Sequence, residues 1–215
     1  MGIGMNREQG LAAIESTRII AIVRGVEEDR IAPVAEALLK GGVRVMEVTM
    51  NTPGWQRMIH HLQDKYGQQM YVGAGTVLDA EDAGKAVDAG ASFLVTPNTD
   101  PQVIRYAAER NLPVFPGAMT PSEIVTAWKA GATAVKIFPG ASLGMKYLKE
   151  LQGPLNHVPM VAVGGVNEDN IGDFLSICYA VGIGGSLINL EQIHAGNYGW
   201  IADKAARLIA KVTSR

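Results

Sequence analysis

The sequence has very little cysteine: among 215 residues, Cys178 is the only one. A single cysteine forms neither an intrachain disulfide nor a cysteine-based metal cage, which fits a reducing compartment. The 19 basic and 21 acidic residues leave a net charge of −2, without the Lys/Arg cluster that nucleic-acid binding requires. The apolar runs fall short of the ~20 residues of a membrane span, and residues 1–10 lack a signal-peptide layout. We therefore expect a cytoplasmic protein without nucleic-acid or membrane partners.

Signals for metals and nucleotide cofactors are also missing. None of the four histidines follows a predicted strand beside a carboxylate, as a zinc or iron site would require: His60, His61, His157 and His194. The segments 73–75 and 182–184 lack the third glycine of a dinucleotide fingerprint, and no Walker loop is present. The sequence predicts no metal and no cofactor.

Glycine, by contrast, is abundant, with 25 of 215 residues, or about 12% against an average near 7%. Three segments, 37–45, 86–95 and 126–135, share one pattern: a helical stretch ends in small residues and glycine, and a β-branched run follows. Glycine at such a position supplies the left-handed conformation that ends a helix. Each segment therefore predicts a helix-to-strand junction.

Eight short apolar runs start every 20 to 28 residues, which is typical of βα units. They span 19–24, 43–48, 71–73, 93–95, 114–115, 134–138, 160–163 and 180–183. Thr52-Pro53 and Thr120-Pro121 each place proline at a predicted first helical position. Eight units predict a single (β/α)₈ barrel domain over 1–215, with a short N-terminal helix or a disordered lead within 1–14. The alternative, a doubly wound open sheet, normally has fewer strands and a dinucleotide fingerprint.

Two ionisable residues interrupt runs that otherwise predict buried strands. Lys136 lies in the run 134–138, and Glu47 lies between Met46 and Val48. A desolvated lysine has a lowered pKa and can attack a carbonyl group to form a Schiff base, while a nearby carboxylate can move the protons that imine chemistry needs. A structural ion pair inside the barrel would explain both residues equally well.

Glycine pairs follow the last two predicted strands, where barrels commonly bind phosphate on backbone N–H groups. Gly164 and Gly165 follow the seventh strand, and Gly185 and Ser186 follow the eighth. Ser186 would add a hydroxyl group to such a site. Arg24, at the end of the first strand, is a candidate for binding a substrate anion.

Six motifs in order resemble the 2-dehydro-3-deoxy-phosphogluconate (KDPG) and 4-hydroxy-2-oxoglutarate (KHG) aldolases, with the phosphogalactonate aldolases as close relatives. The motifs occupy 41–49, 72–78, 95–97, 116–117, 135–139 and 163–166. The resemblance implies a metal-free class I lyase of the Entner–Doudoroff route, usually a cytoplasmic homotrimer, in which Lys136 forms an imine with pyruvate and Glu47 shuttles protons. It further implies that Thr76 binds the pyruvyl carboxylate, that Pro97 and Phe138 line the same pocket, and that the glycine loops bind phosphate.

Two positions depart from the phosphogluconate pattern. Asn51 stands where many members have arginine, and Val163 stands where they have threonine. These residues and the Arg24-Gly25 pair resemble the phosphogalactonate branch more closely. Arg24 could then take over the substrate carboxylate.

The resemblance thus implies cleavage of 2-dehydro-3-deoxy-6-phosphogluconate, a 2-keto-3-deoxy sugar acid phosphate, to pyruvate and glyceraldehyde 3-phosphate. Two alternatives of the same class are 2-dehydro-3-deoxy-6-phosphogalactonate and 4-hydroxy-2-oxoglutarate aldolases. An alternative of a different class is a catalytically silent phosphosugar-binding barrel, in which Lys136 and Glu47 form only an ion pair.

Overall fold

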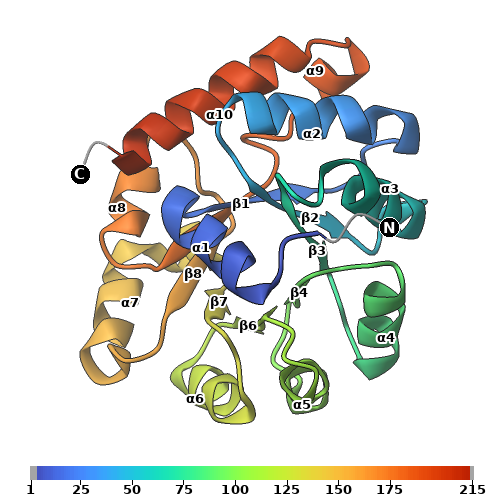
Figure 1. Ribbon diagram of the computed structural model, residues 1–215. Helices are drawn as coiled ribbons and strands as arrows, with labels where there is room; N and C mark the ends of the chain where they lie inside the picture. The colour runs from blue at the N-terminus through green and yellow to red at the C-terminus, as the bar shows by residue number, and fades with distance from the viewer. Residues whose placement is uncertain (1–3, 214–215) are drawn as a thin grey trace.

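Parallel strands alternate with helices and close into a barrel in this computed structural model, which describes residues 4–213 (Figure 1). The strands are β1 (Ile19–Val23), β2 (Val45–Thr49), β3 (Tyr71–Gly75), β4 (Leu94–Val95), β5 (Val114–Phe115), β6 (Gly117–Ala118), β7 (Val135–Ile137), β8 (Met160–Val163) and β9 (Ala180–Ile183). The helices are α1 (Arg7–Thr17), η1 (Glu28–Arg30), α2 (Ile31–Lys40), α3 (Trp55–Tyr66), α4 (Ala80–Asp88), α5 (Pro101–Glu109), α6 (Pro121–Ala130), α7 (Gly140–Leu155), α8 (Ile171–Leu175), α9 (Leu190–His194) and α10 (Tyr198–Thr213). The predicted barrel with a short N-terminal helix is confirmed, while residues 1–3 and 214–215 of the predicted domain lie outside the described residues.

The barrel closes through a strand that is divided in two. The strand order is β5-β4-β3-β2-β1-β9-β8-β7-β6, and every neighbouring pair is parallel. Its two ends, β5 and β6, are successive pieces of the chain separated by Pro116. Proline has no N–H to donate, but the Pro116 carbonyl oxygen still accepts a hydrogen bond from the Lys136 N–H at 2.8 Å. The eight predicted strands are therefore present, with the fifth in two parts.

The local signals were correct at the glycine junctions and at one of the two proline positions. Gly42, Gly90 and Gly131 all have positive φ where a helix turns toward a strand. Thr120 caps α6, with Pro121 at its first position. The prediction at Thr52-Pro53 was wrong, because α3 begins only at Trp55. The Thr52 hydroxyl instead accepts the Gly25 N–H at 3.0 Å and bonds Thr49 at 3.0 Å, so it ties two loops together and caps no helix.

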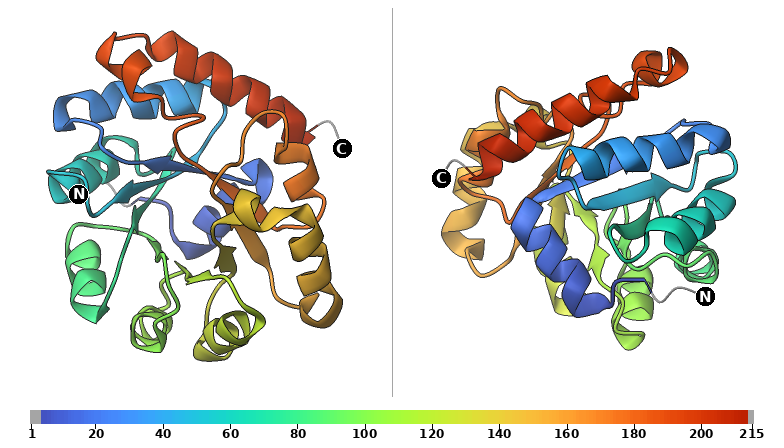
Figure 2. Two further views of the ribbon diagram at one scale, coloured as in Figure 1. Left: turned by 180° about the vertical axis from the view of Figure 1, so that it is seen from behind. Right: turned by 45° about the horizontal axis from the view of Figure 1, so that its top comes forward.

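Helix α1 closes one end of the barrel. Its Ala13 and Ile14 pack into the interior core together with the rings of Tyr71, Phe93 and Phe115. Tyr71 stacks on Phe93 with ring centroids 5.0 Å apart, and Phe93 meets Phe115 edge-on at 5.8 Å. Figure 1 looks at this closed end, and Figure 2 (left) shows the opposite end from behind.

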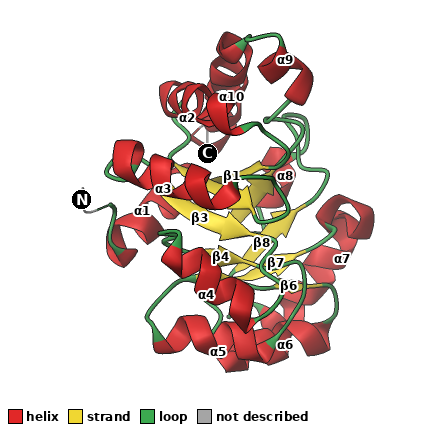
Figure 3. Ribbon diagram, turned by 90° about the vertical axis from the view of Figure 1, so that its right-hand side faces the viewer, coloured by secondary structure: helices red, strands yellow, loops and turns green. Residues whose placement is uncertain are grey.

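A second, larger core lies between the strands and the surrounding helices (Figure 3). Residues along each strand alternate between the two cores, as the twofold periodicity of a strand requires. Within residues 4–213, no helix is both long and apolar enough to cross a membrane. Polar side chains gather at the strands' carboxyl ends, opposite α1, where barrels of this kind carry out their chemistry.

Candidate functional site

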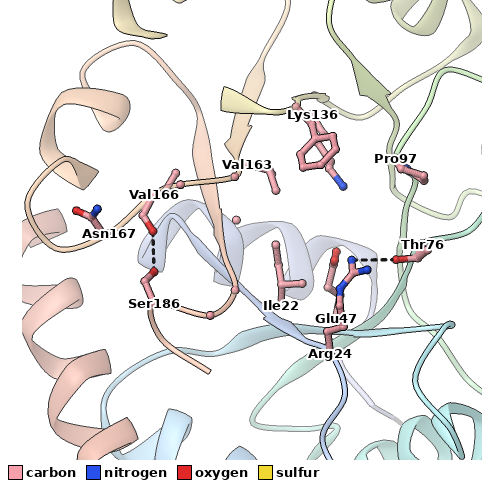
Figure 4. Close-up of a pocket in the computed structure, with 16 residues that line it drawn as sticks. Ile22, Arg24, Glu47, Thr76, Pro97, Lys136, Val163, Val166, Asn167 and Ser186 are labelled. Atoms are coloured by element: carbon pink, nitrogen blue, oxygen red, sulfur yellow. Dashed lines mark hydrogen bonds between the residues drawn. The ribbon is translucent and has the colours of Figure 1, made fainter. Parts of the chain in front are cut away.

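Lys136 and Glu47 are the only buried charged side chains in residues 4–213, at 7% and 2% exposure. Val135 and Ile137 pack outward against the helices, so Lys136 between them points into the barrel. Glu47 occupies the same kind of position on β2. Figure 4 shows the two side chains reaching into one pocket from facing walls. No ion pair within 4.0 Å joins them in the described part of the chain.

Two glycines on β3 make space inside the barrel, Gly75 for the Glu47 carboxyl group and Gly73 for the Phe93 ring. A Cβ atom at Gly75 would lie 2.7 Å from Glu47 Cδ, and one at Gly73 would lie 2.6 Å from the Phe93 ring. Glu47 therefore rests directly against the backbone of Gly75. The glycine spacing in the motif 73–75 follows from this close approach rather than from a phosphate-binding turn.

Burial shifts the pKa of each ionisable group toward its neutral form. It raises the pKa of the Glu47 carboxyl group above its ordinary value, against the opposing charges of Lys136 and Arg24. It lowers the pKa of the Lys136 amine; Glu47 opposes this shift, whereas Arg24 adds to it. A fraction of neutral amine thus becomes available as a nucleophile, and a protonated carboxyl group becomes available as a proton donor.

Arg24 and Thr76 meet at the rim of the pocket. The Arg24 guanidinium donates a hydrogen bond to Thr76 Oγ1 at 3.3 Å (Figure 4). Thr76 has φ 62°, which is an outlier for a β-branched residue and costs on the order of 1–3 kcal/mol. Backbone strain of this kind concentrates at binding and catalytic sites. The cation and the hydroxyl group together form a polar edge suited to a carboxylate.

All eleven predicted site residues line a single pocket of about 550 Å³. They are Arg24, Glu47, Thr76, Pro97, Lys136, Phe138, Val163, Gly164, Gly165, Gly185 and Ser186. Their individual roles stay predictions. The structure nevertheless brings together residues from every part of the sequence at one end of the barrel.

The side of the pocket formed by the β8 and β9 loops offers unused backbone donors. Gly164 and Gly165 have φ of 95° and 74°. Within residues 4–213, no hydrogen bond uses the N–H groups of Gly165, Val166, Gly185 or Ser186. Successive free N–H groups in such a conformation form a concave anion site. This side of the pocket is therefore suited to a phosphate group.

The hydroxyl group of Ser186 is already engaged. It donates a hydrogen bond to the carbonyl oxygen of Val166 at 2.7 Å and so links the two glycine loops (Figure 4). A hydroxyl group has one proton to donate. Ser186 would have to leave Val166 before it could donate to a phosphate.

Apolar side chains form the walls between these two ends. The Phe138 ring is 41% exposed, and Lys136 Nζ lies 5.1 Å from its centroid. Val163 lies opposite Gly182, where a Cβ atom would approach Val163 Cγ2 to 2.8 Å. Pro97 fits because residue 117, beside it, is glycine. The apolar walls around Lys136 thus limit the shape of the substrate and offer it few polar contacts.

Sequence reasoning missed five residues that line the same pocket: Ile22, Val166, Asn167, Gly182 and Gly184. Ile22 and Gly182 carry a detectable signal, since they lie on predicted strands at inward positions. Val166 and Asn167 belong to a loop and carry no such signal. Asn51 is exposed and does not line the pocket. Residues 4–213 contain no group of three His, Cys, Asp or Glu side chains placed to hold a metal ion.

The sequence of this chain is similar to those of known proteins. The family model "KDPG and KHG aldolase" matches residues 11–203. The chain is 36% identical to 2-dehydro-3-deoxy-6-phosphogalactonate aldolase of Escherichia coli (strain K12) over 81% of this chain and 86% of that one. It is 32% identical to 2-dehydro-3-deoxy-phosphogluconate aldolase of Haemophilus influenzae over 95% of both chains.

Solved structures give the same result. "Native KDPGal structure" superposes with a TM-score of 0.85 at 34% identity, over 90% of this chain and 93% of that one. The KDPG aldolase of Legionella pneumophila, solved with pyruvate as a covalent carbinolamine intermediate, gives 0.86 at 28% identity, over 93% and 98%. The resemblance carried by the six motifs is confirmed. This chain belongs to the KDPG and KHG aldolase family and is an aldolase-type carbon–carbon lyase.

Proposed function

We propose that this protein is a metal-independent class I aldolase that reversibly cleaves 2-dehydro-3-deoxy-6-phosphogluconate to pyruvate and glyceraldehyde 3-phosphate. The observation that carries the proposal is the buried Lys136 amine, which faces the Glu47 carboxyl group across a pocket with free N–H donors on its far side. The pocket thus has one end suited to a ketone and another suited to a phosphate.

The proposed reaction begins when the neutral Lys136 amine attacks the C2 ketone; a proton taken up from solvent lets the C2 oxygen leave as water, which gives a protonated imine. The Glu47 carboxylate then takes the C4 hydroxyl proton. The electrons of the C3–C4 bond move into the imine, so glyceraldehyde 3-phosphate departs and an enamine remains on Lys136. Glu47 returns its proton to C3, and water hydrolyses the protonated imine to pyruvate and the free amine, with one proton released to solvent. The chemistry requires no metal or cofactor.

The two polar edges of the pocket are assigned to the two anionic groups of the substrate, its carboxylate and its phosphate. Arg24 and Thr76 hold the C1 carboxylate beside the imine, and the N–H groups of Gly165 and Gly185 bind the terminal phosphate. Phe138 covers the imine. Each assignment is supported by the position of the residue in the pocket.

A second substrate is favoured by one wall of the pocket. Val163 offers methyl groups where many phosphogluconate enzymes have a threonine hydroxyl, so the C4 hydroxyl finds no side-chain partner there. The 6-phosphogalactonate epimer is therefore the leading alternative, and 4-hydroxy-2-oxoglutarate, which lacks the phosphate, is the next. A silent phosphosugar-binding barrel is disfavoured because Lys136 and Glu47, both within residues 4–213, form no direct ion pair.

The same proposal extends to the setting of the enzyme. We infer one barrel domain over 1–215, which functions as a homotrimer in cytoplasmic carbohydrate metabolism of the Entner–Doudoroff type. Association is supported by the large apolar side chains of Leu78 and Met119, which are 52% and 46% exposed. A reducing compartment is supported by Cys178, which is buried and unpaired.

Borohydride reduction in the presence of pyruvate tests the proposal. Peptide mapping is expected to find one irreversible mass increment, on Lys136. Lys129 and Lys146 lie outside the pocket and serve as internal controls. Lys136→Ala should lose cleavage of both hexonate epimers while keeping the wild-type circular dichroism spectrum. A label on Lys129 or Lys146 with Lys136 unmodified would refute the assignment.

A further inference from the structure

Asn170 lies just outside the pocket and holds the β8 loop through both ends of its side-chain amide. Its Nδ2 donates to the carbonyl oxygen of Gly165 at 2.9 Å, and its Oδ1 accepts the N–H of Asn167 at 2.8 Å. These two bonds fix the peptide units on either side of Val166. Asn170 takes no part in the steps of the proposed reaction.

The carbonyl oxygen and N–H of a trans peptide point in opposite directions. Because Asn170 binds the Gly165 carbonyl oxygen on the outer side of the loop, the N–H of Val166 points to the other side, toward the pocket that Val166 lines. The next carbonyl oxygen, that of Val166, is held in turn by Ser186 Oγ. Asn170 thus holds the Gly165 carbonyl oxygen on the outer side of the loop, and Ser186 engages the Val166 carbonyl oxygen.

This restraint matters because the loop is intrinsically free to change conformation. Gly164 and Gly165 both have positive φ, and glycine populates several backbone regions at little cost. A side chain at 165 cannot replace the restraint, since its Cβ would overlap Ala141. If the peptide between Gly165 and Val166 turned over, its carbonyl oxygen would face a bound phosphate and repel it.

We propose that Asn170 is a positioning residue that sets the preference of this enzyme for a phosphorylated substrate. The inference rests on the proposed function, because it concerns the loop to which the phosphate is assigned. Asn170 acts through the backbone of residues 165 and 166 and does not touch the substrate. Its loss should weaken phosphate binding and leave the chemistry at Lys136 intact.

Glu168 provides a matched control on the same loop. It accepts hydrogen bonds from Lys204 Nζ at 2.8 Å and Arg207 Nε at 3.2 Å, and so anchors the outer part of the loop to α10. It makes no hydrogen bond to the glycine carbonyl groups. Glu168→Gln therefore loosens the loop without releasing the Gly165 carbonyl oxygen.

The experiment compares wild type, Asn170→Ala, Asn170→Asp and Glu168→Gln with two substrates, the 6-phosphorylated hexonate and 4-hydroxy-2-oxoglutarate. Each Asn170 variant loses the donor to Gly165, so KM for the phosphorylated substrate should rise about fivefold to tenfold. The kcat and KM for 4-hydroxy-2-oxoglutarate, and the rate of borohydride trapping with pyruvate, should stay at wild-type values. Thermal unfolding and circular dichroism establish that each variant is folded.

The outcomes separate this inference from the proposed function. Equal kcat/KM of wild type for the two substrates would overturn the phosphate site itself, and the inference with it. A wild-type preference of roughly a hundredfold that persists in Asn170→Ala would overturn the role of Asn170 alone. So would equal losses with both substrates, which would indicate general damage. A selective loss in Glu168→Gln as large as that in Asn170→Ala would assign the effect to loop anchoring in general.

Discussion

The close approach of Glu47 to Gly75 allows the position of the carboxylate to be tested without changing the carboxylate. A Cβ atom at residue 75 would lie 2.7 Å from Glu47 Cδ and nearer still to Oε1. Ordinary contact distances are about 3.5–4.0 Å, so Gly75→Ala must displace the carboxylate by roughly 1 Å. Because the carboxylate ends a flexible side chain, the fold should tolerate this at a cost of about 1 kcal/mol.

A displacement of that size should lower kcat by about a hundredfold, which corresponds to about 2.7 kcal/mol in the barrier. In the proposed reaction Glu47 has to reach the C4 hydroxyl group and later C3 from one position, so a shift of the carboxylate should impair both proton transfers. The three heavy atoms nearest to the new methyl group all belong to Glu47 and none to Lys136. Pyruvate release, measured with lactate dehydrogenase and NADH, should therefore collapse while borohydride trapping on Lys136 continues.

Gly84→Ala on α4 is the control for an added methyl group. Its Cβ would lie 3.6 Å from the Tyr106 hydroxyl oxygen, an ordinary contact, and alanine favours a helix over glycine by about 0.5–1 kcal/mol. Wild-type turnover is expected. Full turnover in Gly75→Ala would show that the carboxylate position is unimportant. Loss of imine trapping in that variant would show that the damage reaches Lys136, and either result would refute the reasoning.

Two further predictions concern charge and metal. The double variant Glu47→Gln/Lys136→Met should be more stable than wild type near pH 7, with about 2–4 °C in Tm for each kcal/mol gained, because both buried groups disfavour their charged forms. The raised pKa of Glu47 makes this gain shrink as pH falls toward 4, and the lowered pKa of Lys136 makes it shrink as pH rises toward 10. Thermal melts over this pH range would contradict the prediction if the difference in Tm between the variant and wild type had no maximum near neutral pH. Turnover should survive exhaustive EDTA treatment, and a loss restored by Zn²⁺ or Mg²⁺ would instead indicate a metal-dependent aldolase.

The reactive end of the pocket could be predicted because it breaks a strong pattern. A lysine and a glutamate inside apolar runs stand out from their neighbours, and the alternation of a strand assigns them to the barrel interior. The repeat of glycine-ended helices and short strands predicted the barrel for a similar reason, since each βα unit repeats the same local signals. Lys136 and Glu47 therefore needed no knowledge of contacts between distant residues.

Two features that sequence reasoning missed depend on such distant contacts. Thr52-Pro53 has the local appearance of a helix start, but the Thr52 hydroxyl instead accepts the N–H of Gly25, 27 residues away in the sequence. The division of the fifth strand at Pro116 becomes visible only when β4 and β7 are in place on either side. Local preference loses in both cases to tertiary hydrogen bonds.

The anion end of the pocket illustrates the same limit in a form that bears on substrate choice. Its proposed donors are backbone N–H groups, which every residue except proline supplies, so side-chain identity there says little about affinity. What differs between loops is which carbonyl oxygens are already engaged by side chains, and in this chain Asn170 engages that of Gly165 and Ser186 that of Val166. Under the proposed function, discrimination between the C4 epimers is expected to depend on Val163, at the end of β8, which offers only methyl groups. A polar partner for the C4 hydroxyl is therefore missing at residue 163, and we expect the epimers to differ less in kcat/KM than phosphorylated and unphosphorylated substrates do.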